Sequence, residues 1–275
     1  MKVKQIARAS LVGLGTIIMC SSIAFGVAAN SFHSAANGYS VAIPVGWIQI
    51  PDSTIREMSN SVMSAEGRSR ISYEAGFQSG TASRWFDYPY VLIQILRYSD
   101  FGLSGQIPKS QFANLVRAIS GSDPTEITET FLSGESQKIA SDFVLGRPYL
   151  DTQNNRFGYG LTIHVANVGR VRGAIAGHFG KYGIIQIAYY DRECNWIGSK
   201  PERDFIFASF AFDATMGYDD TYAAEGSLAG HLGEGAVKGL AQTAFLIVVG
   251  SACALFVTLR QVRRRRKQNT PESTL

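Results

Sequence analysis

The chain has 275 residues, with 26 Lys and Arg against 22 Asp and Glu, and its formal net charge is +4. Nine of the cations lie within residues 1–8 and 260–267, whereas all but one of the acids lie within residues 30–239. That central part therefore has 17 cations and 21 acids, a net charge of about −4. A basic groove for nucleic-acid phosphates is not supported by this balance, so we expect no nucleic-acid partner.

The N-terminus has the layout of a secretory signal. Three cations in the first eight residues precede an apolar stretch over residues 11–27. Two alanines follow, and small residues at this place suit cleavage before Asn30. The pattern predicts a cleaved signal peptide over residues 1–29. The alternative is an uncleaved helix, because the uncharged stretch runs from residue 9 to residue 33 and is long enough to span a membrane.

One domain is predicted over residues 38–215, after a short N-terminal lead over residues 30–37. Alternating apolar and polar residues predict its first strand at residues 39–43. A helix is expected over residues 54–65, with Ser53 as its N-cap.

Two strands and a second helix are expected next. The strands are predicted at residues 70–78 and 88–98, and the second is nearly all apolar, which is typical of a strand covered on both faces. Apolar residues at helical spacing predict a helix over residues 109–119. The polar composition of residues 120–137 indicates a surface insertion.

A meander of five strands is predicted after the insertion, at residues 139–145, 147–151, 157–165, 171–179 and 183–190. If Ala166 pairs with Arg170 across a three-residue turn, His164 lies opposite Arg172 on one face of the sheet, and apolar residues of both strands share the other face. A helix starting at Pro201 closes the domain.

The C-terminus predicts a membrane anchor. Residues 216–239 are rich in glycine and suggest a flexible tether. Residues 240–259 carry no charge, and twenty helical residues span about 30 Å, the thickness of a hydrocarbon core. The six cations within residues 260–267 should stay on the cytoplasmic side, so the tail over residues 260–275 is expected in the cytosol, near anionic lipid. Small residues in the predicted span leave pairing with a second helix open.

Cysteine usage permits no internal disulfide in the exported part. Cys20 lies in the predicted signal and Cys253 in the predicted anchor, so Cys194 is the single cysteine between them. About 200 residues suffice for a core without disulfides. Cys194 is interpreted as a packed thiol beside Trp196, with an intermolecular or redox role as the alternative.

The sequence offers little catalytic signal. It contains no nucleophile elbow, zinc-protease motif or phosphate-binding glycine loop. His164 and His178, on strands expected to be adjacent, with Asp191 and Glu193 just beyond the next strand, could hold a metal ion or act as acid and base. Isolated sheet histidines are preferred, because metal sites need three or four converging ligands. A Cys194 and His178 nucleophile pair lacks an orienting group. We expect neither a metal nor a cofactor.

The segment over residues 85–90 is the candidate ligand site. Its rings could stack on sugars or on a peptide if they are exposed. Ordinary core packing is the alternative, because large aromatic side chains are usually buried. The candidate ligand-binding residues are Trp85, Phe86, Tyr88 and Tyr90.

Two segments resemble a known family. Residues 38–47 (GYSVAIPVGW) resemble the first strand and Pro-x-Gly-Trp turn of PsbP-like domains, and residues 204–212 (DFIFASFAF) resemble their last helix and strand. The resemblance implies an α/β/α sandwich around an antiparallel sheet. It also implies a binding or assembly module, because no shared catalytic motif accompanies this fold.

These observations predict an α+β domain, with helices flanking an antiparallel sheet, and one C-terminal transmembrane helix. The expected protein is a single-pass component of the bacterial inner membrane whose main domain is extracytoplasmic. It would bind a protein partner at the membrane without catalysis. The alternatives are a cell-wall or carbohydrate-binding module and a metal-dependent hydrolase using His164 and His178.

Overall fold

The computed structural model describes residues 29–66, 73–101, 103, 105–121 and 140–221. Most of the predicted signal peptide and surface insertion, and all of the predicted anchor, lie outside these residues. Within the described ranges, no helix is long and apolar enough to cross a membrane.

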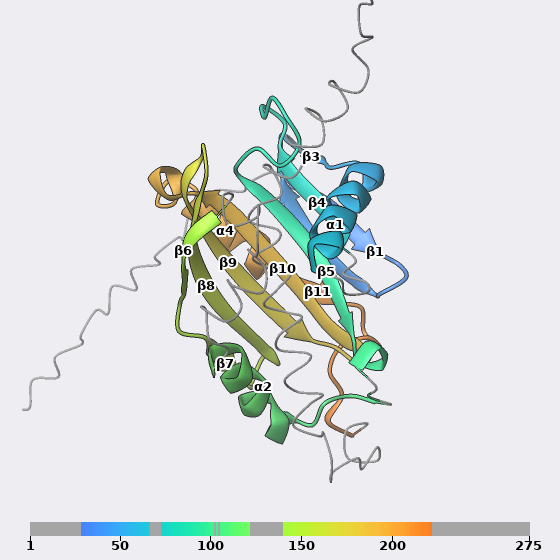
Figure 1. Cartoon of the computed structure of the whole chain (residues 1–275). Helices are drawn as coiled ribbons and strands as arrows, with labels where there is room; N and C mark the ends of the chain where they lie inside the picture. The colour runs from blue at the N-terminus through green and yellow to red at the C-terminus, as the bar shows by residue number, and fades with distance from the viewer. Residues whose placement is uncertain (1–28, 67–72, 102, 104, 122–139, 222–275) are drawn as a thin grey trace, which may run out of the picture.

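An antiparallel sheet of eight strands forms the centre of the described structure (Figure 1). Its strand order is β3-β4-β5-β10-β9-β8-β6, and β7 also pairs with β8. The strands are β3 (Trp47–Gln49), β4 (Tyr73–Ser79), β5 (Tyr90–Arg97), β6 (Ala140–Leu145), β7 (Tyr149–Asp151), β8 (Arg156–Val165), β9 (Gly169–Phe179) and β10 (Gly183–Arg192). The five strands predicted after the insertion are thus confirmed, with ends shifted by a few residues.

A second sheet of three strands packs on one face of the first. It has the order β1-β2-β11, with β1 (Ala29–Ser34), β2 (Tyr39–Pro44) and β11 (Ala211–Phe212). The sequence prediction missed β1, which occupies most of the expected lead. Glu74 on β4 joins the two sheets, because its carboxylate accepts hydrogen bonds from Ser34, Asn37 and Tyr39.

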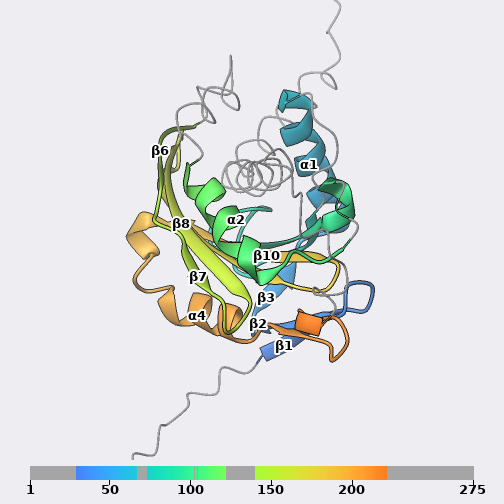
Figure 2. The ribbon, with the colours of Figure 1, turned by 90° about the horizontal axis from the view of Figure 1, so that it is seen from below.

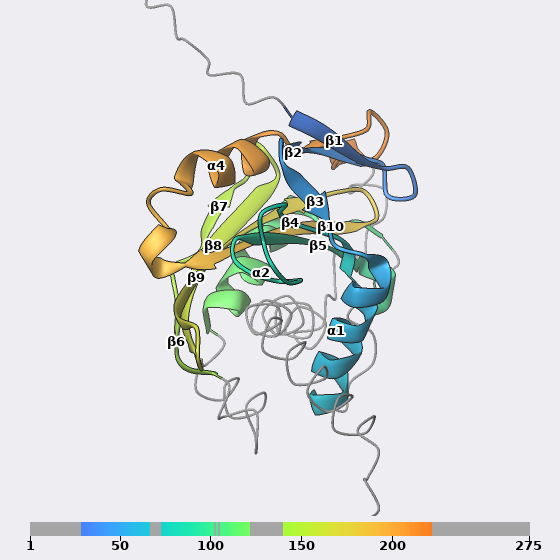
Figure 3. The same cartoon turned by 90° about the horizontal axis from the view of Figure 1, so that it is seen from above.

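Helices cover both faces of the large sheet (Figures 2 and 3). On one face lie α1 (Asp52–Glu66) and α2 (Lys109–Gly121), and on the other lie α4 (Lys200–Ala208) and the small sheet. Short 3₁₀ turns, η1 (Tyr98–Phe101) and η3 (Glu193–Asn195), follow β5 and β10.

Strand β5 is buried on both faces, as its apolar sequence predicted. Tyr90 and Leu92 belong to the core under α1 and α2, whereas Val91 and Ile93 belong to the core under α4 and the small sheet. Because successive side chains of β5 point to opposite faces of the sheet, this strand contributes residues to both cores.

Two local predictions need correction. Helix α1 begins at Asp52, so Ser53 lies inside its first turn, and the backbone N–H of Ile55 donates to the carbonyl oxygen of Pro51 at 3.0 Å. The β8–β9 turn begins one residue earlier than expected, so His164 pairs with Arg170. The correction moves each pairing by two residues, which leaves the two predicted faces of the hairpin unchanged.

The described chain ends on the body of the domain. Gly217 forms a β-bridge with Gly180 at the β9–β10 turn, and the N–H of Lys181 donates to the carbonyl oxygen of Met216 at 3.0 Å. The Tyr218 hydroxyl donates to the carbonyl oxygen of Ile107 at 3.0 Å. The first residues of the predicted tether are therefore packed against the domain.

Candidate functional site

The predicted aromatic segment is mostly buried. Phe86 and Tyr90 are 0% exposed and Tyr88 is 8% exposed, and all three belong to the core under α1 and α2. Gln78 holds the turn, because its Oε1 accepts the Phe86 N–H at 2.7 Å. Trp85 keeps partial exposure, so a ligand contact by this segment stays a prediction that rests on Trp85.

The structure does not bring the two candidate histidines together. His164 is exposed and pairs with Arg170 near one end of the hairpin, whereas His178 pairs with Arg156 at the other end. His178 stacks on Phe210 with ring centroids 3.9 Å apart, and burial lowers its pKa to about 3. Across the described ranges, no cluster of three or more His, Cys, Asp or Glu side chains could hold a metal ion.

The other candidates lie apart as well. Glu193 forms an ion pair with Arg170 at 3.5 Å, and Asp191 is buried on β10. Cys194 is exposed, so its interpretation as a packed thiol is wrong. Cys194 lies in the 3₁₀ turn that follows β10, where the chain leaves the sheet.

An open groove lies between α4 and the outer face of β8 and β9. It encloses about 390 Å³, within the range of roughly 300–1,000 Å³ that is typical of ligand pockets. We call it the arginine groove. Its lining includes Gly146, Arg147, Tyr149, Gly160, Thr162, Arg172, Ala174, Trp196, Arg203, Asp204 and Phe207.

Small side chains keep the floor of the arginine groove open. Gly160 on β8 pairs with Ala174 on β9, where alternation along a half-buried strand would place larger side chains. A Cβ atom added at Gly160 would meet no atom closer than the carbonyl oxygen of Gly173, at 3.6 Å. The volume above Gly160 is therefore free space that neighbouring side chains do not fill.

Two arginines and a tryptophan form one wall. The guanidinium carbon of Arg203 lies 3.9 Å from the ring centroid of Trp196, and that of Arg172 lies 5.0 Å from the same centroid. Arg203 is 8% exposed, and its Nη1 donates to the carbonyl oxygen of Trp196 at 3.2 Å. Arg203 on α4 therefore stacks on the indole ring of Trp196 at the edge of the groove.

These arginines lack acidic partners within the part of the chain that the structure describes. No carboxylate lies within ion-pair distance of Arg172 or Arg203 there, and Asp204 in the lining pairs with Lys200. Asp191 pairs in register with Arg172, but burial raises the pKa of its carboxyl. Burial also lowers the pKa of Arg203, although a guanidinium stays charged in proteins. The charge of Asp204 acts on Arg203, but Asp204 is paired with Lys200, so the wall keeps a positive charge that favours an incoming anion.

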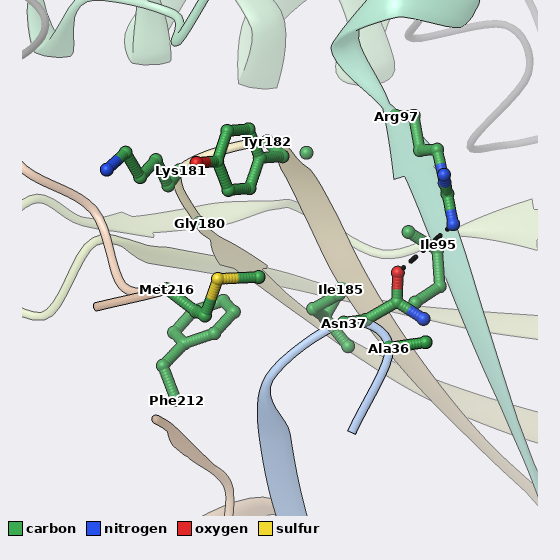
Figure 4. Close-up of a pocket in the computed structure, with 11 residues that line it drawn as sticks. Ala36, Asn37, Ile95, Arg97, Gly180, Lys181, Tyr182, Ile185, Phe212 and Met216 are labelled. Atoms are coloured by element: carbon green, nitrogen blue, oxygen red, sulfur yellow. Dashed lines mark hydrogen bonds between the residues drawn. The ribbon is translucent and has the colours of Figure 1, made fainter. Parts of the chain in front are cut away.

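A second cavity of about 140 Å³ lies at the β9–β10 turn (Figure 4). Arg97 and Asn37 meet on one side of it, where the guanidinium Nη2 donates to Asn37 Oδ1 at 3.3 Å, and Lys181 and Tyr182 lie on the other side. We prefer the arginine groove as the candidate site, because it is larger and contains a nearly buried cation.

Sequence reasoning missed most of the arginine groove. It placed Arg172 on the correct face of the sheet but did not single out Arg203, Trp196 or Arg147. A signal was present, because two small residues face each other on the neighbouring strands, at Gly160 and Ala174. Such a pair indicates a place that large side chains do not fill.

Among solved structures, the chain is similar to cyanobacterial PsbP (CyanoP) from Synechocystis sp. PCC 6803, with 13% identity and a TM-score of 0.43 over 74% of this chain and 98% of that chain. It is similar to LpqN of Mycobacterium tuberculosis, described as involved in cell envelope biogenesis, with 12% identity and a TM-score of 0.37 over 67% and 90% of the two chains. It is also similar to the Ran-binding protein Mog1p of Saccharomyces cerevisiae, with 8% identity and a TM-score of 0.32 over 67% and 95%.

No protein-family model matches the chain, and no curated protein matches its sequence.

Proposed function

We propose that this chain is a non-catalytic binding module of the bacterial envelope, and that the arginine groove is where it contacts a protein partner. The observation that carries the proposal is the open space of about 390 Å³ above Gly160. Apolar surface and buried polar groups around unfilled space are stabilised when a partner fills it.

The chemistry of the lining suits binding better than catalysis. Arginine donors and aromatic rings dominate the wall around Trp196, and Asp204 at the edge is held by Lys200. The separation of His164 and His178 argues against the metal-dependent hydrolase. The burial of Phe86, Tyr88 and Tyr90 argues against a carbohydrate platform on that segment.

The location follows from the predicted ends of the chain. The signal peptide over residues 1–29 and the anchor over residues 240–259 would hold the domain outside the cytoplasm, in a single-pass inner-membrane protein. The domain itself would be the PsbP-like α/β/α sandwich, attached by its tether, and the tail over residues 260–275 would face anionic lipid in the cytosol.

The proposal is tested by filling the arginine groove in the full-length chain. A photo-crosslinking amino acid replaces Tyr149, which is 54% exposed at the groove, and cells are irradiated with and without Gly160→Leu. The matched control is Gly105→Leu, because a Cβ at Gly105 meets no atom within 4 Å, so it is not crowded either, and Gly105 lies outside the groove.

We expect one protein to be captured by the parent and by Gly105→Leu, and to be lost in Gly160→Leu. Equal capture of that protein by both leucine variants would show that the partner does not use the groove.

A further inference from the structure

We infer that the arginine groove recognises a carboxylate that is adjacent to an apolar side chain in a peptide segment of the partner. This inference rests on the proposed function and names the chemistry of its ligand. The inference rests on one juxtaposition. The nearly buried guanidinium of Arg203 stacks on Trp196, and it lies beside the open floor at Gly160 and Ala174.

The stacking of Arg203 leaves its hydrogen-bonding edge available. A guanidinium that lies over an indole ring uses its face, whereas its five N–H donors point outward in its own plane. One of these donors reaches the carbonyl oxygen of Trp196. The planar fork of the remaining donors matches the two oxygens of a carboxylate, which arginine binds in a bidentate manner.

Further cations make the groove locally positive. Arg172 lies over the same ring, and Arg147 is exposed in the lining. Asp204 is the acid in the lining, and Lys200 compensates its charge. Because the predicted exported part has a net charge of about −4, this positive spot contrasts with the rest of its surface. Such a contrast directs an acidic segment to the groove.

The lining of the groove also includes exposed apolar side chains. Tyr149 is 54% exposed and Val144 is 56% exposed, and Phe207 on α4 is partly exposed. Exposed rings and aliphatic side chains gathered around a pocket mark a contact surface. An apolar side chain beside the carboxylate would cover them and rest on Gly160 and Ala174.

The arrangement favours a peptide over a sugar. Two guanidinium groups lie over the ring of Trp196, so this ring stacks on cations and is not free to stack on a sugar. The groove is also at the small end of ligand pockets, which suits one or two side chains.

The test uses the purified full-length chain and four labelled peptides of about six residues. The first is blocked at both ends and contains Glu-Phe between Gly and Ser residues. In the second Gln replaces Glu, and in the third Ser replaces Phe. The fourth contains Gln-Phe with a free C-terminal carboxylate on Phe, which separates a terminal carboxylate from a side-chain carboxylate.

We expect the Glu-Phe peptide to bind roughly tenfold or more tightly than the second and third peptides, because each loses one half of the contact. Arg172→Gln and Arg203→Lys should reduce this preference, measured by fluorescence anisotropy. Arg97→Gln, at the other cavity, is the matched control and should bind like the parent. Arg172 is only partly buried, so its variant keeps the test decisive if Arg203→Lys does not fold.

Three results would overturn the inference. These are equal affinity for the Glu and Gln peptides, no binding of any carboxylate peptide, and displacement of the Glu-Phe peptide by glucuronic acid at lower concentration than by unlabelled peptide. If one of these occurred while Gly160→Leu still abolished capture in cells, the proposed partner site would stand and only its ligand chemistry would be wrong.

Discussion

Glu74 accepts hydrogen bonds from two nearly buried donors of the small sheet and from the turn between β1 and β2. The Tyr39 hydroxyl donates at 2.5 Å and Asn37 Nδ2 donates at 2.8 Å, and Ser34 Oγ is the third donor. Tyr39 is 0% exposed and Ser34 is 4% exposed, so neither can turn to solvent.

We therefore predict that Glu74→Ala lowers the free energy of unfolding by about 2–4 kcal/mol, because removal of a shared acceptor leaves buried donors unsatisfied. Tyr39→Phe should cost about 1 kcal/mol, since it removes one donor and leaves the acceptor with other partners. Urea unfolding followed by circular dichroism measures both values. A Glu74→Ala variant as stable as the parent would show that the two sheets do not depend on this carboxylate.

His178 makes the fold sensitive to acid. Burial lowers the pKa of His178 from 6.5 to about 3, so below pH 6.5 the unfolded chain binds a proton that the folded chain does not. Stability is then lost as pH falls from about 6.5 towards 3, at up to about 1.4 kcal/mol per pH unit.

We predict that His178→Gln weakens this dependence, as measured by unfolding free energies between pH 4 and pH 7. Parallel pH profiles of the parent and the variant would contradict a neutral buried imidazole.

Two glycines in the hairpin of β8 and β9, Gly160 and Gly177, differ in the space around them. A Cβ at Gly177 would lie 2.3 Å from the ring of Phe157, which is 0% exposed, whereas a Cβ at Gly160 would come no closer than 3.6 Å to any atom. Gly177→Ala is therefore expected to destabilise the domain by about 1–3 kcal/mol through overpacking. Gly160→Ala should be neutral or stabilising by up to about 1 kcal/mol, because alanine restricts the unfolded chain. Melting temperatures of the two variants test this contrast, and equal losses would refute it.

The elements were predictable where one physical pattern decides the structure. Alternation and turn residues located β8, β9 and β10, because each of these strands buries one or both faces. Strand β1 was missed, since His33 and its neighbours directly follow an apolar signal and carry no clear alternation. The arginine groove was not predicted because it depends on where α4 packs, and no local pattern links Arg203 to Gly160.

The whole chain is predicted to have its C-terminus in the cytosol. Lys and Arg next to a transmembrane helix stay on the cytoplasmic side, and six of them follow residue 259. A fluorescent protein that folds only in the cytosol should therefore fluoresce when fused after Leu275, and alkaline phosphatase at the same place should be inactive. The reverse pair of results would invert the topology, and with it the placement of the arginine groove in the envelope.

The contacts of residues 216–220 also determine where mechanical tension would enter the domain. A pull at residue 221 first loads Asp219, held by Gln106 at 2.8 Å, and the bridge between Gly217 and Gly180. Both contacts lead into the large sheet and the segment before α2, whereas β11, with its two-residue ladder at residues 211–212, lies farther from the point of pulling. An anchored domain that grips its partner through α4 would therefore carry force through its eight-stranded sheet and spare the small one.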